Sequence, residues 1–132
     1  INIDRIIKKN DLSNNIEFIK PTLDIKKIYE LSSLVINISI RPEGFGRTVS
    51  EALSMSCPVI APNMGGTKEQ LENFNPKLLF DISSFKSFFK ALEYALNNHK
   101  GVSKNARNFV KENYSADLMC KNTLKIYQNL IN

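Results

Sequence analysis

The stretch that decides the fold reads Ser39-Ile40-Arg41-Pro42-Glu43-Gly44-Phe45-Gly46-Arg47-Thr48-Val49-Ser50-Glu51-Ala52-Leu53. It follows the apolar run Leu34 to Ile38, which predicts a buried strand, and it leads into a segment of helical period from Thr48 to about Ser56. In open parallel sheets, ligands bind where a strand ends and a helix begins. Gly44 and Gly46 let the backbone approach such a ligand closely. We therefore expect the binding site in this loop.

The charges around the loop indicate what the ligand is. The amides of Arg47 and Thr48 are expected to face outward at the positive end of the helix dipole, which suits a diphosphate. Glu43 precedes the helix and Glu51 lies in its first turn, so two carboxylates flank this position. Carboxylates repel phosphate but accept hydrogen bonds from hydroxyl groups, so we expect both to contact sugars.

Each of these residues also has a purely structural interpretation. Thr48-x-x-Glu51 fits a capping box, in which Glu51 would only satisfy a backbone donor. Glu43 could act only as a carboxylate near a helix N-terminus. Arg41 and Arg47 could be phosphate ligands or solvated charges, and for Arg41 the solvated interpretation is favoured.

Short apolar runs alternate with segments of helical period on both sides of this loop. The alternation predicts an α/β fold, with a Rossmann-like parallel sheet of about four strands and helices on both faces. The expected strands are Ile16 to Ile19, Leu34 to Ile38, Pro58 to Ala61 and Lys77 to Phe80. The expected helices are one at the opening residues around Ile3, Ile6 and Ile7, one after Asp24, Thr48 to Ser56, Thr67 to Asn73, and then Ser84 to Asn97, Ser103 to Asn113 and Ala116 to Leu130. We expect the last three to pack on the sheet edge.

Composition places the chain among ordinary globular proteins. Its 132 residues are 42% hydrophobic, which is enough for one domain with a core. The net charge of +5 attracts anions, but the lysines are scattered, so nucleic-acid binding is only an alternative. Cys57 and Cys120 lack metal-site spacing and are interpreted as reduced, buried thiols of a cytoplasmic protein, although a disulfide between them stays open.

The decisive stretch and the segments after it resemble a known family. Glu43-x7-Glu51, then Cys57-Pro58-Val59-Ile60-Ala61 and Gly65-Gly66-x-x-Glu69, is similar to the donor-site signature of family 4 retaining glycosyltransferases. The segments Ile16 to Ile19 and Asn105 to Ser115 extend the resemblance over most of the chain. It implies the two-domain GT-B architecture. Residues 1–132 would then form part of the nucleotide-sugar-binding domain, without its first strand and without the acceptor-binding domain.

The resemblance also implies a role for each site residue. Glu43 would be the catalytic residue and contact donor-sugar hydroxyls near the reacting carbon, and Glu51 would bind the ribose. Gly44, Phe45 and Gly46 would border the sugar, while the amides of Arg47 and Thr48 would hold the diphosphate. All of these roles fall on a single loop and the first turns of the helix after it.

The implied reaction moves a sugar from a UDP- or GDP-type donor to an acceptor, with retention of stereochemistry and with no metal or other cofactor. The acceptor, whether glycan, lipid or small molecule, would bind another domain, so we expect the isolated chain to be inactive. Peripheral contact of the full-length enzyme with the cytoplasmic face of a membrane is a further expectation that the basic residues leave open.

The chain also departs from the family pattern. The family usually places an Arg and a Lys for the diphosphate after its first strand, and no segment here corresponds to them, which fits the alternative of a non-catalytic nucleotide-binding or assembly module. Ser56 stands where the family tends to have Gly. The turn Asn73-Phe74-Asn75-Pro76 also lacks a Gly that the family tends to have, and Asn is expected to take up some of the left-handed conformations that Gly would supply. Gly65-Gly66 is either a tight turn before a helix, with Thr67 and Gln70 as a second capping box, or part of the donor pocket.

Overall fold

The computed structural model describes residues 2–131, and its centre is a three-stranded parallel sheet in the order β1-β2-β3. The strands are β1 (Val35–Ile36), β2 (Val59–Pro62) and β3 (Leu79–Phe80). Val35 pairs with Val59, and Ala61 pairs with Leu79. Every residue of β2 is buried, as expected for the central strand of a parallel sheet covered on both faces. The predicted α/β class with a parallel sheet is confirmed, with three strands in place of about four.

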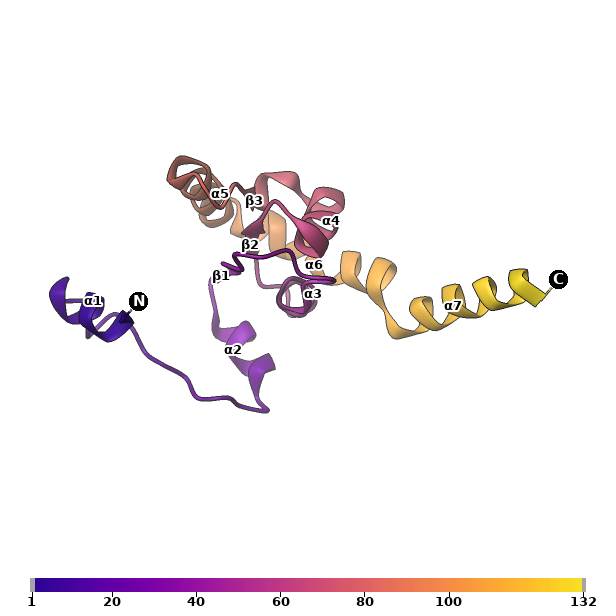
Figure 1. Cartoon of the computed structure of the whole chain (residues 1–132), viewed down its shortest axis with the longest axis horizontal. Helices are drawn as coiled ribbons and strands as arrows, with labels where there is room; N and C mark the ends of the chain where they lie inside the picture. Colours follow the sequence, from indigo (N-terminus) through magenta and orange to yellow (C-terminus); the bar gives the residue numbers. More distant parts are fainter. Residues whose placement is uncertain (1, 132) are drawn as a thin grey trace.

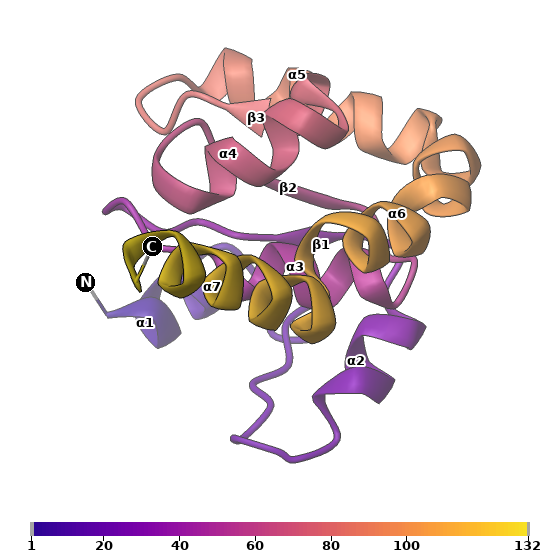
Figure 2. The same cartoon turned by 90° about the vertical axis from the view of Figure 1, so that its right-hand side faces the viewer.

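Seven α-helices and one 3₁₀ turn accompany this sheet in the described part of the chain, with α1 and α7 lying away from it (Figures 1 and 2). They are α1 (Ile3–Lys9), α2 (Ile25–Leu31), α3 (Arg47–Ser54), α4 (Gly65–Phe74), η1 (Pro76–Leu78), α5 (Phe85–Asn97), α6 (His99–Tyr114) and α7 (Ala116–Ile131). Helices α3 and α4 follow β1 and β2 and pack on β2 and on each other. The core forms where they meet the sheet, around the fully buried Leu53, Ile60, Leu71 and Leu78.

The predicted strand at Ile16 to Ile19 is wrong. This segment has no regular structure and runs between α1 and α2, apart from the sheet (Figure 1). Ile16, Phe18 and Ile19 are 42%, 65% and 61% exposed. A strand needs a neighbour to satisfy its backbone donors and acceptors, and within residues 2–131 no strand lies beside this segment. Its apolar composition alone was therefore not sufficient.

The prediction that the last three helices pack on the sheet edge holds only in part. Helix α5 packs on β3, where Phe88 meets Phe80 edge-on, and α6 packs on α3. Helix α7 has no buried residue and projects from the body at the end opposite α1 (Figure 1). Cys120 on α7 is consequently exposed, against expectation, whereas Cys57 is buried, and both thiols are free. None of the helices in residues 2–131 is both long and apolar enough to cross a membrane.

The two departures from the family pattern have different structural outcomes. Ser56 has φ 59°, in the left-handed region where Gly is favoured, directly after α3. Its amide donates to Leu53 O and the next amide, of Cys57, donates to Ala52 O, which is the Schellman arrangement of a helix C-terminus. In the turn Asn73 to Pro76, Asn73 lies within α4 and Asn75 is extended, with φ −163°, so neither Asn takes up a left-handed conformation. The Asn75 side chain accepts from the Lys77 amide at the start of η1.

Candidate donor-binding site

The site loop begins at the carboxyl end of β1 and ends where α3 starts. Gly46 occupies the N-cap position of α3 with φ 81°, a left-handed conformation that turns the chain into the helix. The helix therefore begins at Arg47, one residue earlier than predicted, and Thr48 lies inside it. The predicted capping box of Thr48 and Glu51 is wrong, because the N-cap is a glycine without a side chain.

Glu43 is held by two polar side chains that follow the strand. Its Oε1 accepts hydrogen bonds from Ser39 Oγ and, at 3.0 Å, from Asn37 Nδ2. Asn37 is itself only 6% exposed. The bond from Ser39, followed by that from Asn37, lowers the pKa of Glu43. The carboxylate is thus kept ionised and oriented, and both of these bonds use the same oxygen.

Glu51 connects α3 to α2 through Tyr29 and also pairs with Arg47 in the first turn of α3. Its Oε2 accepts from Tyr29 Oη at 3.1 Å, and its Oε1 accepts from Arg47 Nη2 at 2.8 Å. Burial, with the Glu51 bond second, raises the pKa of Tyr29 to about 12. The Arg47 side chain is 84% exposed, so its ion pair with Glu51 is readily exchanged for another partner. Tyr29 is the fixed contact of this carboxylate and Arg47 the exchangeable one.

Gly65-Gly66 brings the start of α4 against the site loop. The Gly66 amide donates to Glu43 O at 2.8 Å, and Gly65 has φ 55°. A Cβ on Gly65 would lie 2.7 Å from Glu43 O, and one on Gly66 would overlap the Phe45 backbone. Both glycines are therefore required for close packing of helix and loop, beyond forming a tight turn.

The second predicted capping box, of Thr67 and Gln70, is also wrong. Helix α4 starts at Gly65 with Met64 as its N-cap, so Thr67 lies within the first turn. Thr67 Oγ1 donates to the carbonyls of Pro62 and Met64, each at 2.8 Å. Gln70 Nε2 donates to Phe45 O and, at 3.3 Å, to Gly46 O. Neither side chain satisfies a free amide at the start of α4, because both donate to carbonyls.

Two other predicted residues lie on the surface near the loop. The Phe45 ring is 46% exposed and meets the Tyr114 ring edge-on at a centroid distance of 5.6 Å. Arg41 is exposed, in agreement with its interpretation as a solvated charge. The structure thus gathers Glu43, Gly44, Phe45, Gly46, Arg47, Thr48 and Glu51 on one loop and the first two turns of α3. Glu51 lies in the second turn, so its predicted place in the first turn is wrong, because the helix begins earlier than expected.

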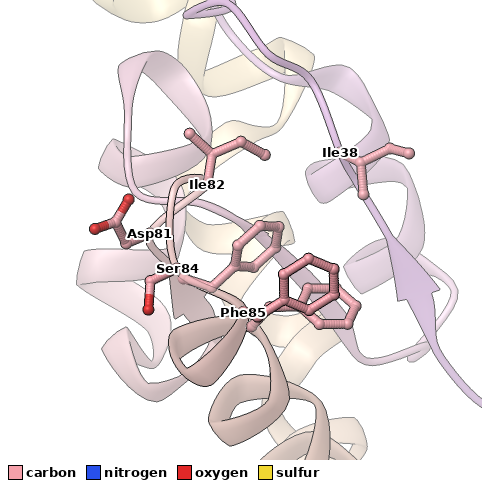
Figure 3. A pocket seen from close by; sticks show the side chains of 7 residues that line it. Ile38, Asp81, Ile82, Ser84 and Phe85 are labelled. Carbon is pink, nitrogen blue, oxygen red and sulfur yellow. The ribbon is translucent and has the colours of Figure 1, made fainter.

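A separate hollow of about 210 Å³ opens beyond the carboxyl ends of β1 and β3. Figure 3 shows Ile38 on one side of it and Phe85 and Ile82 on the other. Its polar groups are engaged locally: Asp81 accepts from Ser83, and Ser84 Oγ accepts from the Ser87 amide. No basic residue is among those that line it, so the hollow is not suited to a diphosphate.

Sequence reasoning missed the residues that hold the site from a distance. Tyr29 and Gln70 lie 22 and 24 to 25 residues from their partners, so no local pattern reveals them. Asn37 could have been found, because it is a polar residue inside the apolar run Leu34 to Ile38. A buried amide in such a run needs a partner, and here that partner is a site carboxylate.

The chain is similar in sequence and in fold to several known proteins. The chain is 26% identical over 117 residues to spore coat protein SA of Bacillus subtilis, covering 86% of this chain and 31% of that protein. A glycosyltransferase structure from Rickettsia africae superposes with a TM-score of 0.85 at 28% identity, covering 98% of this chain and 36% of that one. An Anabaena protein solved with UDP and glucose shares the fold, with a TM-score of 0.82 at 20% identity over 96% of this chain and 35% of its own. The chain therefore spans about a third of the length of these proteins.

The family model for glycosyl transferases group 1 matches residues 2–116, which include β1, the site loop and all of α3 and α4. The predicted half of a GT-B enzyme is consistent with this match and with the similar structures. This chain belongs to the group 1 glycosyl transferase family.

Proposed function

We propose that this chain is the donor-binding part of a retaining glycosyltransferase that moves a sugar from a nucleoside-diphosphate sugar to an acceptor. The single observation that carries the proposal is that the free amides at the start of α3 lie between two oriented carboxylates in the sequence, Glu43 in the loop before the helix and Glu51 within it. Because the chain spans about a third of its relatives, the acceptor site is expected on a part of the protein outside these residues.

The diphosphate would bind at the start of α3. The first amides of a helix have no carbonyl partner within it and carry the positive end of its dipole. The amides of Arg47 and Thr48 are the first two of α3, and in transfer they would stabilise the charge that develops on the leaving diphosphate. No metal or other cofactor enters this proposal.

Glu43 would bind the donor sugar beside the reacting carbon. Its Oε1 is used by Ser39 and Asn37, so a sugar hydroxyl would approach Oε2. The lowered pKa keeps the group an ionised acceptor, which forms stronger hydrogen bonds with hydroxyl donors than a neutral acceptor does. Its catalytic role is to fix the sugar in position.

Glu51 would bind the ribose by exchanging one partner. Tyr29 holds Oε2 from the buried side, whereas the exposed Arg47 holds Oε1. Ribose hydroxyls arriving at Oε1 would release the guanidinium, which could then pair with the diphosphate. One residue pair would thereby couple ribose binding to neutralisation of the phosphates.

The test is a binding series on the full chain with UDP, GDP and a short oligonucleotide at two salt concentrations. UDP is the first choice because a protein of the same fold was solved with UDP and glucose. Saturable binding of one nucleotide that salt weakens little supports the proposal. Steeply salt-dependent binding of the oligonucleotide alone would instead favour a nucleic-acid role.

Two charge-removing variants then locate the site. Glu51→Gln should weaken nucleoside-diphosphate binding while the amide still accepts from Tyr29, and Glu43→Gln should impair donor-sugar use by the full-length enzyme. Glu93→Gln, on the exposed face of α5, is the matched control. Unchanged donor binding and turnover in both site variants would remove the two carboxylates from the site. Donor binding by a full-length protein that never transfers sugar would favour the non-catalytic module.

A further inference from the structure

Gln70 is a fully buried amide side chain that reaches from α4 to the site loop. It is 1% exposed, and its Nε2 donates to the carbonyls of Phe45 and Gly46. Its Oε1 is buried with no hydrogen-bond partner in the described part of the chain. An unsatisfied buried acceptor destabilises the fold, and a leucine of similar size would avoid that cost. Unlike leucine, the glutamine donates two hydrogen bonds to carbonyls of the site loop.

These bonds help to determine where the loop amides point, together with the bond that the Val49 amide donates to the Gly46 carbonyl at 3.0 Å. In a trans peptide unit the N–H is directed opposite to the C=O. The Phe45 carbonyl shares its plane with the Gly46 amide, and the Gly46 carbonyl shares its plane with the Arg47 amide. The Gly66 amide binds the Glu43 carbonyl in the same way. It thereby also fixes the direction of the Gly44 amide, which lies in the same peptide plane. Helix α4 thus holds three loop carbonyls on its own side and directs the amides of Gly44, Gly46 and Arg47 away from it.

We infer that Gln70 is a positioning residue for the diphosphate, because it orients the Gly46 and Arg47 amides before the ligand arrives. The inference rests on the proposed function of the loop. Glycines at positions 44 and 46 give this segment more backbone freedom than other residues at these two positions would. Donors that are already oriented bind an anion without a further loss of conformational entropy. Gln70 removes that freedom from outside the ligand's path.

Gln70→Leu keeps the side-chain volume and removes both donors. Inorganic pyrophosphate, UDP and uridine are titrated separately against the wild-type chain and the variant. Pyrophosphate and UDP should each bind roughly tenfold more weakly to the variant, since a lost orienting bond is of that size, while uridine binding is unchanged. Gln128→Leu, the same substitution on the exposed surface of α7, should change none of the three affinities.

A second measurement separates positioning from core packing. Amide hydrogen exchange of Gly46 and Arg47 should accelerate in Gln70→Leu without ligand, while exchange in β2 stays as in the wild type. Gln70→Met, which also lacks a donor, provides the same test if the leucine variant does not fold.

Three results would overturn the inference. Equal pyrophosphate affinity in the wild type and a folded variant rejects it while leaving the proposed function intact. Equal weakening of uridine and UDP shows a general packing defect and also rejects it. A wild-type chain that binds neither pyrophosphate nor UDP rejects the proposed function and this inference together.

Discussion

At the scale of single residues, the site depends on side chains whose role is to hold other side chains. Ser39 and Asn37 bind Glu43, and Tyr29 binds Glu51. A carboxylate with a free side chain would sample several rotamers, and ordering it on binding would weaken the affinity for a sugar. The holding residues remove that entropy loss in advance, so their substitution should alter the site without removing any group that touches the ligand.

Ser39→Ala should raise the pKa of Glu43 toward its ordinary value, because the Ser39 bond is the main cause of the lowered pKa. A lowered folded pKa contributes stability that is complete above the unfolded pKa and is lost as pH falls through the folded value. The variant should therefore lose less stability on acidification than the wild type. Carboxyl-carbon NMR titration of Glu43 measures the shift directly. Ser54→Ala, whose hydroxyl binds only a backbone carbonyl, should leave the titration unchanged.

Ser56→Gly should stabilise the chain by about 0.5–1 kcal/mol. The serine is left-handed at the C-terminus of α3, where an L-residue is strained by about 1–2 kcal/mol, and glycine's greater freedom in the unfolded chain offsets part of the gain. Denaturant unfolding measures the difference. Ser54→Gly, at the last residue of α3, should instead lower stability, because its backbone is helical and glycine has a lower helix propensity than serine. A destabilised Ser56→Gly would show that the Schellman turn is not strained by its side chain.

At the scale of elements, α4 is the part of the fold on which the site loop rests. Its first two residues are glycines because any Cβ there meets the backbone of Glu43 or Phe45. The contact joins two strand-to-helix connections at the same edge of the sheet, as the parallel order β1-β2-β3 requires. The geometry of the loop consequently depends on both α3 and α4, and α4 lies outside the signature from Glu43 to Glu51.

Gly66→Ala should destabilise the chain by roughly 1–3 kcal/mol, because the added methyl overlaps the Phe45 backbone and forces α4 from the loop. Gly101→Ala, inside α6 with nothing within 4 Å of its new Cβ, should instead be stabilising by up to about 1 kcal/mol. Thermal or denaturant unfolding of the two variants provides the comparison. Equal effects of the two substitutions would mean that the contact between α4 and the loop is loose.

The elements also show what sequence patterns can and cannot predict. The runs around Val35, Val59 and Leu79 became strands because each has a parallel neighbour, while Ile16 to Ile19 has none within residues 2–131. The predicted capping boxes are wrong because the N-caps are Gly46 and Met64, which precede Thr48 and Thr67 in the sequence. The loop itself was predictable, because its signature is local. Its supports were not, because Tyr29 and Gln70 meet it only after the chain has folded.

At the scale of the whole molecule, the chain exposes more surface than a compact domain of its mass. Its accessible surface is 10203 Å², whereas a compact monomer of 15.0 kDa exposes about 7,000 Å². The excess comes from the extended ends, since α7 has no buried residue and α1 buries only Ile7. The packed core is confined to the region from α2 to α6. The chain thus consists of one packed body with two helical ends that bury little surface.

This arrangement predicts two levels of protection in native-state hydrogen exchange. Amides of β2 and α3 should open only when the body unfolds, whereas those of α7 should open locally, because little buried surface resists fraying. Exchange in β2 should therefore be on the order of a thousandfold or more slower than in α7, as expected for a body stable by several kcal/mol. Peptide-level exchange measured by mass spectrometry at low protein concentration is sufficient to resolve the two levels. Protection of α7 equal to that of β2, and independent of dilution, would show that α7 packs onto the body and that the excess surface is not exposed in solution.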